Sequence, residues 1–296
     1  MKKLFTLLAF GFTGLTFSQL ITTKESNEKF STGLQNAIVT TIYENTLDNT
    51  KNEWKNELKK LKHEKIKDKD NEVFGDNVLI KEWGNNAVDF YTTFIEDKKT
   101  KTIVMSLAID LGGTYLSSST DAEKFKFIEI MTKDFAAKMS REPITNTIKQ
   151  SEKQLSKLED DKKNLEKENK NLKNDIDDYK KKIVQAEKDV IDKNATIETK
   201  KSEINVQKKV VDASSNAVNE QAKSSKKILE KLEGQLKDTE KEKKNLKGDI
   251  DTYKNKITKA EKEIKQNEYN QAKQKVVIEE QKKSIEDLTK KLQAIN

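Results

Sequence analysis

The residues with the chemistry for catalysis are few and scattered. His63 is the only histidine, and it sits between Lys62 and Glu64 at the end of an expected helix. A catalytic histidine needs an orienting carboxylate and a nucleophile that the fold brings to it. Nothing around His63 indicates either, so we interpret it as a solvated surface residue. The chain has no cysteine, hence no disulfide and no thiolate ligand or nucleophile.

Two other groups resemble binding motifs. Asp110-Leu-Gly-Gly113 could offer backbone amides to an anion, but one glycine pair is a poor phosphate signature and favours a turn at the end of a strand. Asp175, Asp177 and Asp178 fall on an expected helix and lack the glycine turn of a calcium loop. We therefore predict no catalytic residue, no cofactor, no metal site and no enzyme activity.

The charge pattern argues against nucleic acid as a partner. The net charge is +7, but lysine and glutamate alternate and do not form a basic stripe. Arg141 is the only arginine, although planar recognition of bases and phosphates favours arginine. The expected partners are proteins, and interleaved charges suit the solvated flanks of a coiled coil.

The back half of the chain carries the strongest pattern. From about Ile144 to Ile295, apolar residues recur in alternating steps of three and four, between Lys, Glu, Asp, Asn and Gln. A 3.5-residue period sustained over many heptads predicts a left-handed coiled coil. The predicted seam residues are Leu155, Leu158, Leu165, Leu172, Ile176, Tyr179, Ile183, Ala186, Val190, Ile197, Ile204, Leu232, Leu236, Leu246, Ile250, Tyr253, Ile257, Ala260, Ile264, Ile278, Ile285 and Leu288.

This coil is built from a duplicated helix. Asn171 to Ile183 matches Asn245 to Ile257 at an offset of 74 residues, and a tyrosine and an alanine recur at the same heptad positions. We place the two copies at about 144–212 and 226–296. Polar residues interrupt the seam in both copies and should weaken it locally while restricting its register: Lys162, Asn169, Lys193, Lys200, Thr239, Lys243, Asn267, Gln271 and Gln274.

The two copies could form one continuous stalk or fold back as an antiparallel hairpin. The joining segment, Asp212 to Lys226, has two serine pairs but neither glycine nor proline. If facing residues sum to about 440, Tyr179 meets Ala260, Ala186 meets Tyr253 and Asn169 meets Gln271. Large-against-small packing then favours the hairpin, although mixed layers could shift the sum by three or four. Each helix would be roughly 100 Å long, giving an elongated molecule.

The first residues predict export. Lys2 and Lys3 precede an apolar run from Leu4 to Phe17, and Thr16 and Ser18 suit cleavage before Gln19. The run is short for a membrane anchor, which needs about 20 residues. We expect residues 1–18 to be a signal peptide, and the mature chain to be periplasmic or extracellular with no membrane span.

Residues 19–143 predict a globular α+β head. We expect strands over 37–43, 78–83, 87–96 and 102–110, a weaker strand over 63–70, and helices over 48–61 and from Asp121. The strands should form an antiparallel meander with the helices on one face. Pro143, the only proline, suits the first turn of a helix and is the expected boundary between head and coil.

The order of these elements over residues 35–140, behind a signal peptide, resembles small secreted domains of TATA-binding-protein-like (helix-grip) topology. The resemblance implies a binding or scaffolding fold and does not imply DNA binding, because fold does not fix function.

Two function classes follow from these predictions. The first is a structural or interaction protein of the bacterial cell envelope, in which a head on a coiled-coil rod acts as spacer, tether or assembly scaffold. The second is a periplasmic holding chaperone with a tentacle-like hairpin, similar in outline to Skp-type and prefoldin-type assemblies. The joining segment offers only Val218 as an exposed apolar grip, which disfavours the chaperone. Whether the hairpin stays monomeric or pairs into a four-helix bundle stays open.

Overall fold

A computed structural model of the protein describes residues 20–214 and 220–295; the predicted signal peptide and Val218 lie outside these residues. The described chain forms two compact units. The head unit comprises the residues up to Ser156 together with those from Glu280, and the hairpin unit comprises Lys157–Glu279.

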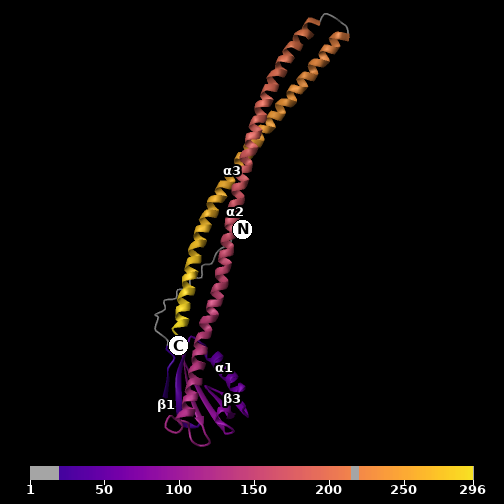
Figure 1. The fold of residues 1–296 in the computed structure, drawn as a ribbon. Helices are drawn as coiled ribbons and strands as arrows, with labels where there is room; N and C mark the ends of the chain where they lie inside the picture. The colour runs from indigo at the N-terminus through magenta and orange to yellow at the C-terminus, as the bar shows by residue number, and fades with distance from the viewer. Residues whose placement is uncertain (1–19, 215–219, 296) are drawn as a thin grey trace. The chain divides into compact units, whose positions relative to one another are not determined.

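The head unit is built on a six-stranded sheet in the order β1-β2-β6-β5-β4-β3, with every neighbouring pair antiparallel (Figure 1). The last four strands form the predicted meander. The strands are β1 Thr23–Phe30, β2 Gly33–Tyr43, β3 Lys65–Lys69, β4 Glu72–Leu79, β5 Ala87–Asp97 and β6 Thr102–Asp110.

In the part of the chain that the structure describes, three α-helices complete the fold: α1 Leu47–Lys60, α2 Ala122–Ser214 and α3 Glu220–Gln293. The Thr46 side chain caps α1 by accepting a hydrogen bond from the Asn49 backbone N–H. Lys59 and Lys60 in the last turn of α1 complement the negative end of its dipole. α2 is long enough to contribute to both units.

The head core lies between one face of the sheet and the helices α1 and α2. Alternate residues along β5 and β6 point to this face, and Phe90, Phe94 and Met105 are fully buried there. Trp54 of α1 enters the same core, where its indole N–H donates to Thr92 Oγ1 at 2.8 Å. Its ring packs edge-on against Phe135 of α2, with ring centroids 4.9 Å apart.

Two parts of the head differ from the predictions. No strand was predicted before residue 37, yet Thr23–Phe30 forms β1; as an edge strand it is polar along most of its length and buries mainly Phe30. The strand expected over 78–83 ends at Leu79, and Lys81–Trp83 forms a 3₁₀ turn labelled η1. β4 begins earlier than expected, at Glu72. The sequence did not reveal its first half because a bulge between Gly75 and Val78 interrupts the alternation of buried and exposed residues.

The predicted helix start at Pro143 is wrong, because α2 begins at Ala122 and runs through Pro143 without ending. A proline inside a helix leaves the carbonyl four residues earlier without its usual N–H donor. That carbonyl belongs to Met139, and the Asn45 side chain donates to it at 2.7 Å. A side chain from the loop before α1 thus replaces the missing backbone hydrogen bond.

The hairpin unit confirms the antiparallel arrangement of the two long helices. Its register is shifted by about four from 440, which is the shift that mixed layers allowed, and Tyr179 stacks on Tyr253 and not on Ala260. Asn169 bonds to Glu268, and Asn267 bonds to Glu168, so facing residues sum to about 436 and not 440. The buried asparagines favour this register because each donates to a glutamate that flanks the seam on the opposite helix.

Candidate functional site: the anchored helical hairpin

The residues with catalytic potential do not converge in the head. His63 follows α1, is half-buried, and its Nδ1 lies 2.8 Å from the Leu61 carbonyl oxygen. In residues 20–214 and 220–295 no group of three or more His, Asp or Glu side chains could hold a metal ion. Asp175, Asp177 and Asp178 are exposed along α2.

The Asp110 turn uses its amides internally. Asp110 Oδ1 accepts from the Gly112 and Gly113 backbone N–H groups at 2.9 and 2.6 Å. Both glycines have positive φ, which a side chain would disfavour. The segment is the predicted strand-ending turn, and its two glycine amides already have an acceptor.

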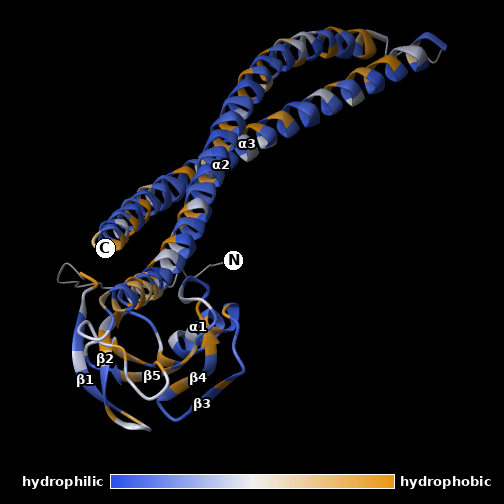
Figure 2. Ribbon diagram, turned by 60° about the horizontal axis from the view of Figure 1, so that its bottom comes forward, coloured by the Kyte–Doolittle hydropathy of each residue, from blue (hydrophilic) through white to orange (hydrophobic). Residues whose placement is uncertain are grey.

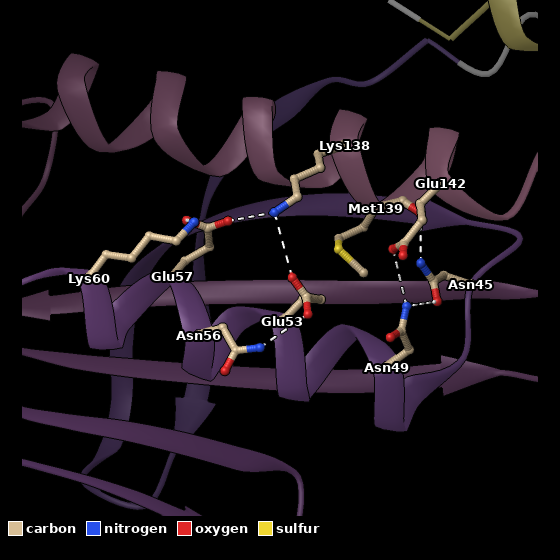
Figure 3. A network of polar contacts seen from close by, with 9 residues as sticks. All are labelled: Asn45, Asn49, Glu53, Asn56, Glu57, Lys60, Lys138, Met139 and Glu142. Carbon is tan, nitrogen blue, oxygen red and sulfur yellow. Dashed lines mark hydrogen bonds and ion pairs between the residues drawn. The ribbon is translucent and has the colours of Figure 1, made fainter. Parts of the chain in front are cut away.

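A polar network joins α1 to α2 inside the head unit (Figure 3). Lys138 of α2 reaches Glu57 at 2.7 Å and Glu53 at 3.6 Å, one turn apart on α1. The hydrogen bonds from Lys138 and Lys60 lower the pKa of the Glu57 carboxyl. Its ionised form therefore stabilises this contact above the usual glutamate pKa, and that contribution is lost as the pH falls below it.

The same figure shows how the chain around Pro143 is held. Asn49 Nδ2 donates to Asn45 Oδ1 at 3.1 Å and lies 3.3 Å from Glu142 Oε2. Asn45 is thereby oriented so that its own amide faces the Met139 carbonyl. Helix α2 is supported at the residue where a proline would otherwise weaken it.

The end of α3 is anchored in the head unit as well. Ile295 is fully buried in the head core, and Leu288 lines the same cluster. The Arg141 guanidinium donates twice to the Ile295 carbonyl oxygen, at 3.0 and 2.6 Å. Lys291 forms a 2.6 Å ion pair with Glu44. The head therefore holds the beginning of α2 and the end of α3.

Each predicted seam residue is either buried or half-buried. The buried ones are Ile176, Ala186, Ile197, Ile204, Ile250, Ala260, Ile278 and Leu288. The half-buried ones are Leu155, Leu158, Leu165, Leu172, Tyr179, Ile183, Val190, Leu232, Leu236, Leu246, Tyr253, Ile257, Ile264 and Ile285. In Figure 2 these helices are mostly blue, with orange positions recurring along them.

The polar seam positions lie in the same layers. Asn169, Thr239, Asn267 and Gln274 are buried, and the other five predicted polar positions, Lys162, Lys193, Lys200, Lys243 and Gln271, are half-buried. The Gln274 amide donates to the Leu158 carbonyl oxygen at 2.9 Å. Asn169 Oδ1 is buried and accepts no hydrogen bond. The layer is therefore satisfied only in part, which costs stability.

The duplication gives the hairpin unit a local two-fold symmetry. The Tyr179 and Tyr253 rings, equivalent at the 74-residue offset, stack 5.9 Å apart. The equivalent pair Lys182 and Lys256 lies within 6 Å of both rings.

More distant contacts obey the same symmetry. Lys193 pairs with Glu242. At the 74-residue offset, Lys193 corresponds to Asn267 and Glu242 corresponds to Glu168, and these two residues are also hydrogen-bonded. Each copy of the repeat therefore pairs with the other about an axis at the tyrosine stack.

One apolar feature escaped the sequence reasoning. Val206, Val210 and Ile228 are 62, 45 and 48 % exposed, close to where α2 ends and α3 begins. We call these three residues the turn-end patch. They lie just outside the joining segment in which we sought exposed apolar residues. Val210 and Ile228 each stand one residue before a seam residue, and that position is the signal that could have found them.

Comparisons with protein families, curated proteins and solved structures gave no match to this chain. Within the described residues, no helix has both the length and the apolar character needed to cross a bilayer. The functional argument therefore rests on the geometry above.

Proposed function

We propose that this protein is an exported, non-catalytic structural or interaction protein of the bacterial cell envelope. Its head would carry the hairpin as a spacer, tether or assembly scaffold. The observation that carries the proposal is the packing of the start of α2 and the end of α3 within the head unit. Ile295 is buried in the head core, and Asn45 repairs the helix at Pro143. A spacer needs helix ends that stay folded, because a frayed helix would not keep a fixed length.

The surface of the hairpin unit supports the same proposal. Ion pairs such as Lys173–Glu268 and Lys208–Glu233 bridge its helices, and each exposed pair contributes little to stability. Their value is in solubility and in the choice of partner helix. A long helix pair with solvated flanks suits spacing or tethering.

Two experiments test the proposal. Residues 1–18, fused to a reporter enzyme that is active only outside the cytoplasm, should give activity that Leu8→Arg in the apolar run abolishes. A photo-crosslinking amino acid at exposed Lys180 of the hairpin and at exposed Ile95 of the head should trap a small, reproducible set of envelope proteins. A silent reporter, or no trapped protein at either site, would reject the proposal.

The alternative is a periplasmic holding chaperone, and the turn-end patch is the observation that favours it. A chaperone grips clients through exposed apolar side chains. It would suppress aggregation of an unfolded protein, and Val210→Ser with Ile228→Ser would remove that suppression. Val184→Ser is the matched control, because Val184 is 67 % exposed on another side of α2. Suppression that survives the patch substitutions would exclude this use of the patch.

A further inference from the structure

The turn-end patch lies on one side of the hairpin unit. Val210 directly precedes the seam residue Val211, and Ile228 directly precedes Leu229, so both occupy the heptad position g. Their numbers sum to 438, two more than a seam layer, which places them opposite each other across the helix pair. Val206 lies one helical turn from Val210 on the same side.

This side is also poor in charge. Its other positions close to the patch are Ala213, Gln221 and Ser224. Glu203 and Lys231 lie at one end of this side, and Lys209 and Lys227 border its outer edge. The opposite side at the same level carries Lys201 and the Lys208–Glu233 ion pair. In a chain with 37 % charged residues, one nearly uncharged side is a candidate contact surface.

We propose that a second copy of this chain covers the turn-end patch. The two hairpin units would lie parallel, related by a two-fold axis along the helices, so that α2 of one copy packs against α3 of the other. Residue 228 lies level with residue 208 in the observed register. Ile228 of the second copy therefore fits between Val206 and Val210. Symmetry makes this contact twice, as an isologous interface requires.

The two charges that lie on the same side as the patch, Glu203 and Lys231, favour this arrangement. Residue 231 lies level with residue 205, so Lys231 of the second copy faces Glu203, and the reverse pair forms across the axis. If the two hairpins ran in opposite directions, α2 would face α2 and neither charge would meet an opposite one. An unfolded client has no fixed charge spacing to match, so the complementarity favours a second copy.

The interface is small. With three apolar side chains per copy, we expect it to bury less than the roughly 800 Å² per partner of a standard interface, so self-association should fall in about the micromolar-to-millimolar range. The patch gives a local four-helix bundle and does not depend on the function proposed above.

Charge exchange tests the proposal in the purified protein by sedimentation equilibrium. Glu203→Lys and Lys231→Glu should each raise the dissociation constant several-fold, because each creates two like-charge contacts. The double exchange should restore the value to within about twofold of the original. Val210→Ser with Ile228→Ser should raise it by about tenfold or more, and Val184→Ser should leave it unchanged. Circular dichroism checks that each variant keeps its helices.

Thiol crosslinking tests the orientation, and the cysteine-free chain makes each introduced thiol unique. A mixture of V210C and I228C chains should form the mixed disulfide in preference to either symmetric one. The proposal is overturned by a protein that stays monomeric at millimolar concentration, by a double exchange that fails to restore association, or by symmetric disulfides that dominate. Capture of unfolded polypeptide at the patch with no self-association would assign the patch to clients instead.

Discussion

The head core and the hairpin seam are built from similar apolar residues but enclose them to different degrees. Trp54, Phe90 and Ile103 in the head are at most 1 % exposed. The least exposed side chains of the described hairpin unit, Ile197, Asn267 and Ile278, are each 4 % exposed, and most seam residues are half-buried. Two helices cannot surround a side chain as a sheet with covering helices can. The hairpin therefore tolerates polar layers, and its stability is spread along its length.

The largest effect expected is in the head. Trp54→Ala should cost about 3–5 kcal/mol, because it removes a fully buried ring and leaves Thr92 Oγ1 without its indole donor. Chemical denaturation followed by circular dichroism measures the loss. Trp83→Ala, at a half-buried position, is the control and should cost much less. Equal costs would mean that burial of the ring does not set the cost of its removal.

A comparable truncation in the seam should have a smaller and local effect. Ile176→Ala should cost about 1–2 kcal/mol, because water can fill the space that it leaves. Hydrogen exchange should show faster opening of amides in the hairpin unit, with head amides unchanged. Equal acceleration in the head would mean that the two units unfold as one.

The support at Pro143 predicts a coupled pair of substitutions. Asn45→Ala should cost about 1 kcal/mol, because the Met139 carbonyl loses its donor. In a Pro143→Ala background the backbone N–H of residue 143 can supply that bond, so the cost should fall by about 0.5–1 kcal/mol. A double-mutant cycle measured by denaturation gives the coupling. Strict additivity would show that Asn45 does not replace the missing bond.

The buried residues Asn169 and Asn267 should lower the stability of the hairpin unit and restrict its register. Replacing Asn169 and Asn267 together by leucine should stabilise the hairpin unit by about 0.5–1 kcal/mol, since it removes a buried oxygen that accepts no hydrogen bond. The same change should permit shifted pairings. Thermal melting measures the first effect, and disulfide trapping between engineered cysteines measures the second. A destabilised variant that keeps a single register would contradict this role.

The smallest effect concerns Tyr91 on the outer face of the sheet. Burial, together with Tyr115 and nearby carboxylates, raises the pKa of Tyr91 from 10.0 to about 12. The folded state therefore holds this proton when the unfolded state has lost it, and stability should fall as the pH rises from 10 towards 12. Tyr91→Phe should flatten that slope in denaturation at pH 9 and pH 11. An unchanged slope would place the pKa near its ordinary value.

The periodic parts of the structure could be predicted from the sequence. The heptad pattern predicted two long helices, and the preference for a hairpin over a stalk is confirmed, although the pairing of Tyr179 with Ala260 that supported it is wrong. Alternation along 87–96 and 102–110 predicted β5 and β6, because those strands bury one face. The helix-grip resemblance stays a prediction.

The rest depended on contacts between distant residues. The register shifted from 440 to about 436 because Asn169 and Asn267 pair with neighbouring glutamates, which no local pattern reveals. Pro143 indicated a helix start because a proline inside a helix removes one backbone hydrogen bond. The residue that replaces this bond, Asn45, lies almost a hundred residues earlier in the chain, so no local pattern reveals it. β1 was missed because its pairing partner, not its own hydrophobicity, makes it a strand.

The local symmetry of the hairpin unit restricts how its length can change. A deletion in one helix alone would shift every layer beyond it and separate Lys193 from Glu242 or Asn267 from Glu168. Removing seven residues from α2 and the seven that face them in α3 keeps every remaining layer in step. The hairpin can thus be shortened or extended only in matched seven-residue increments, so its reach takes discrete values about 10 Å apart.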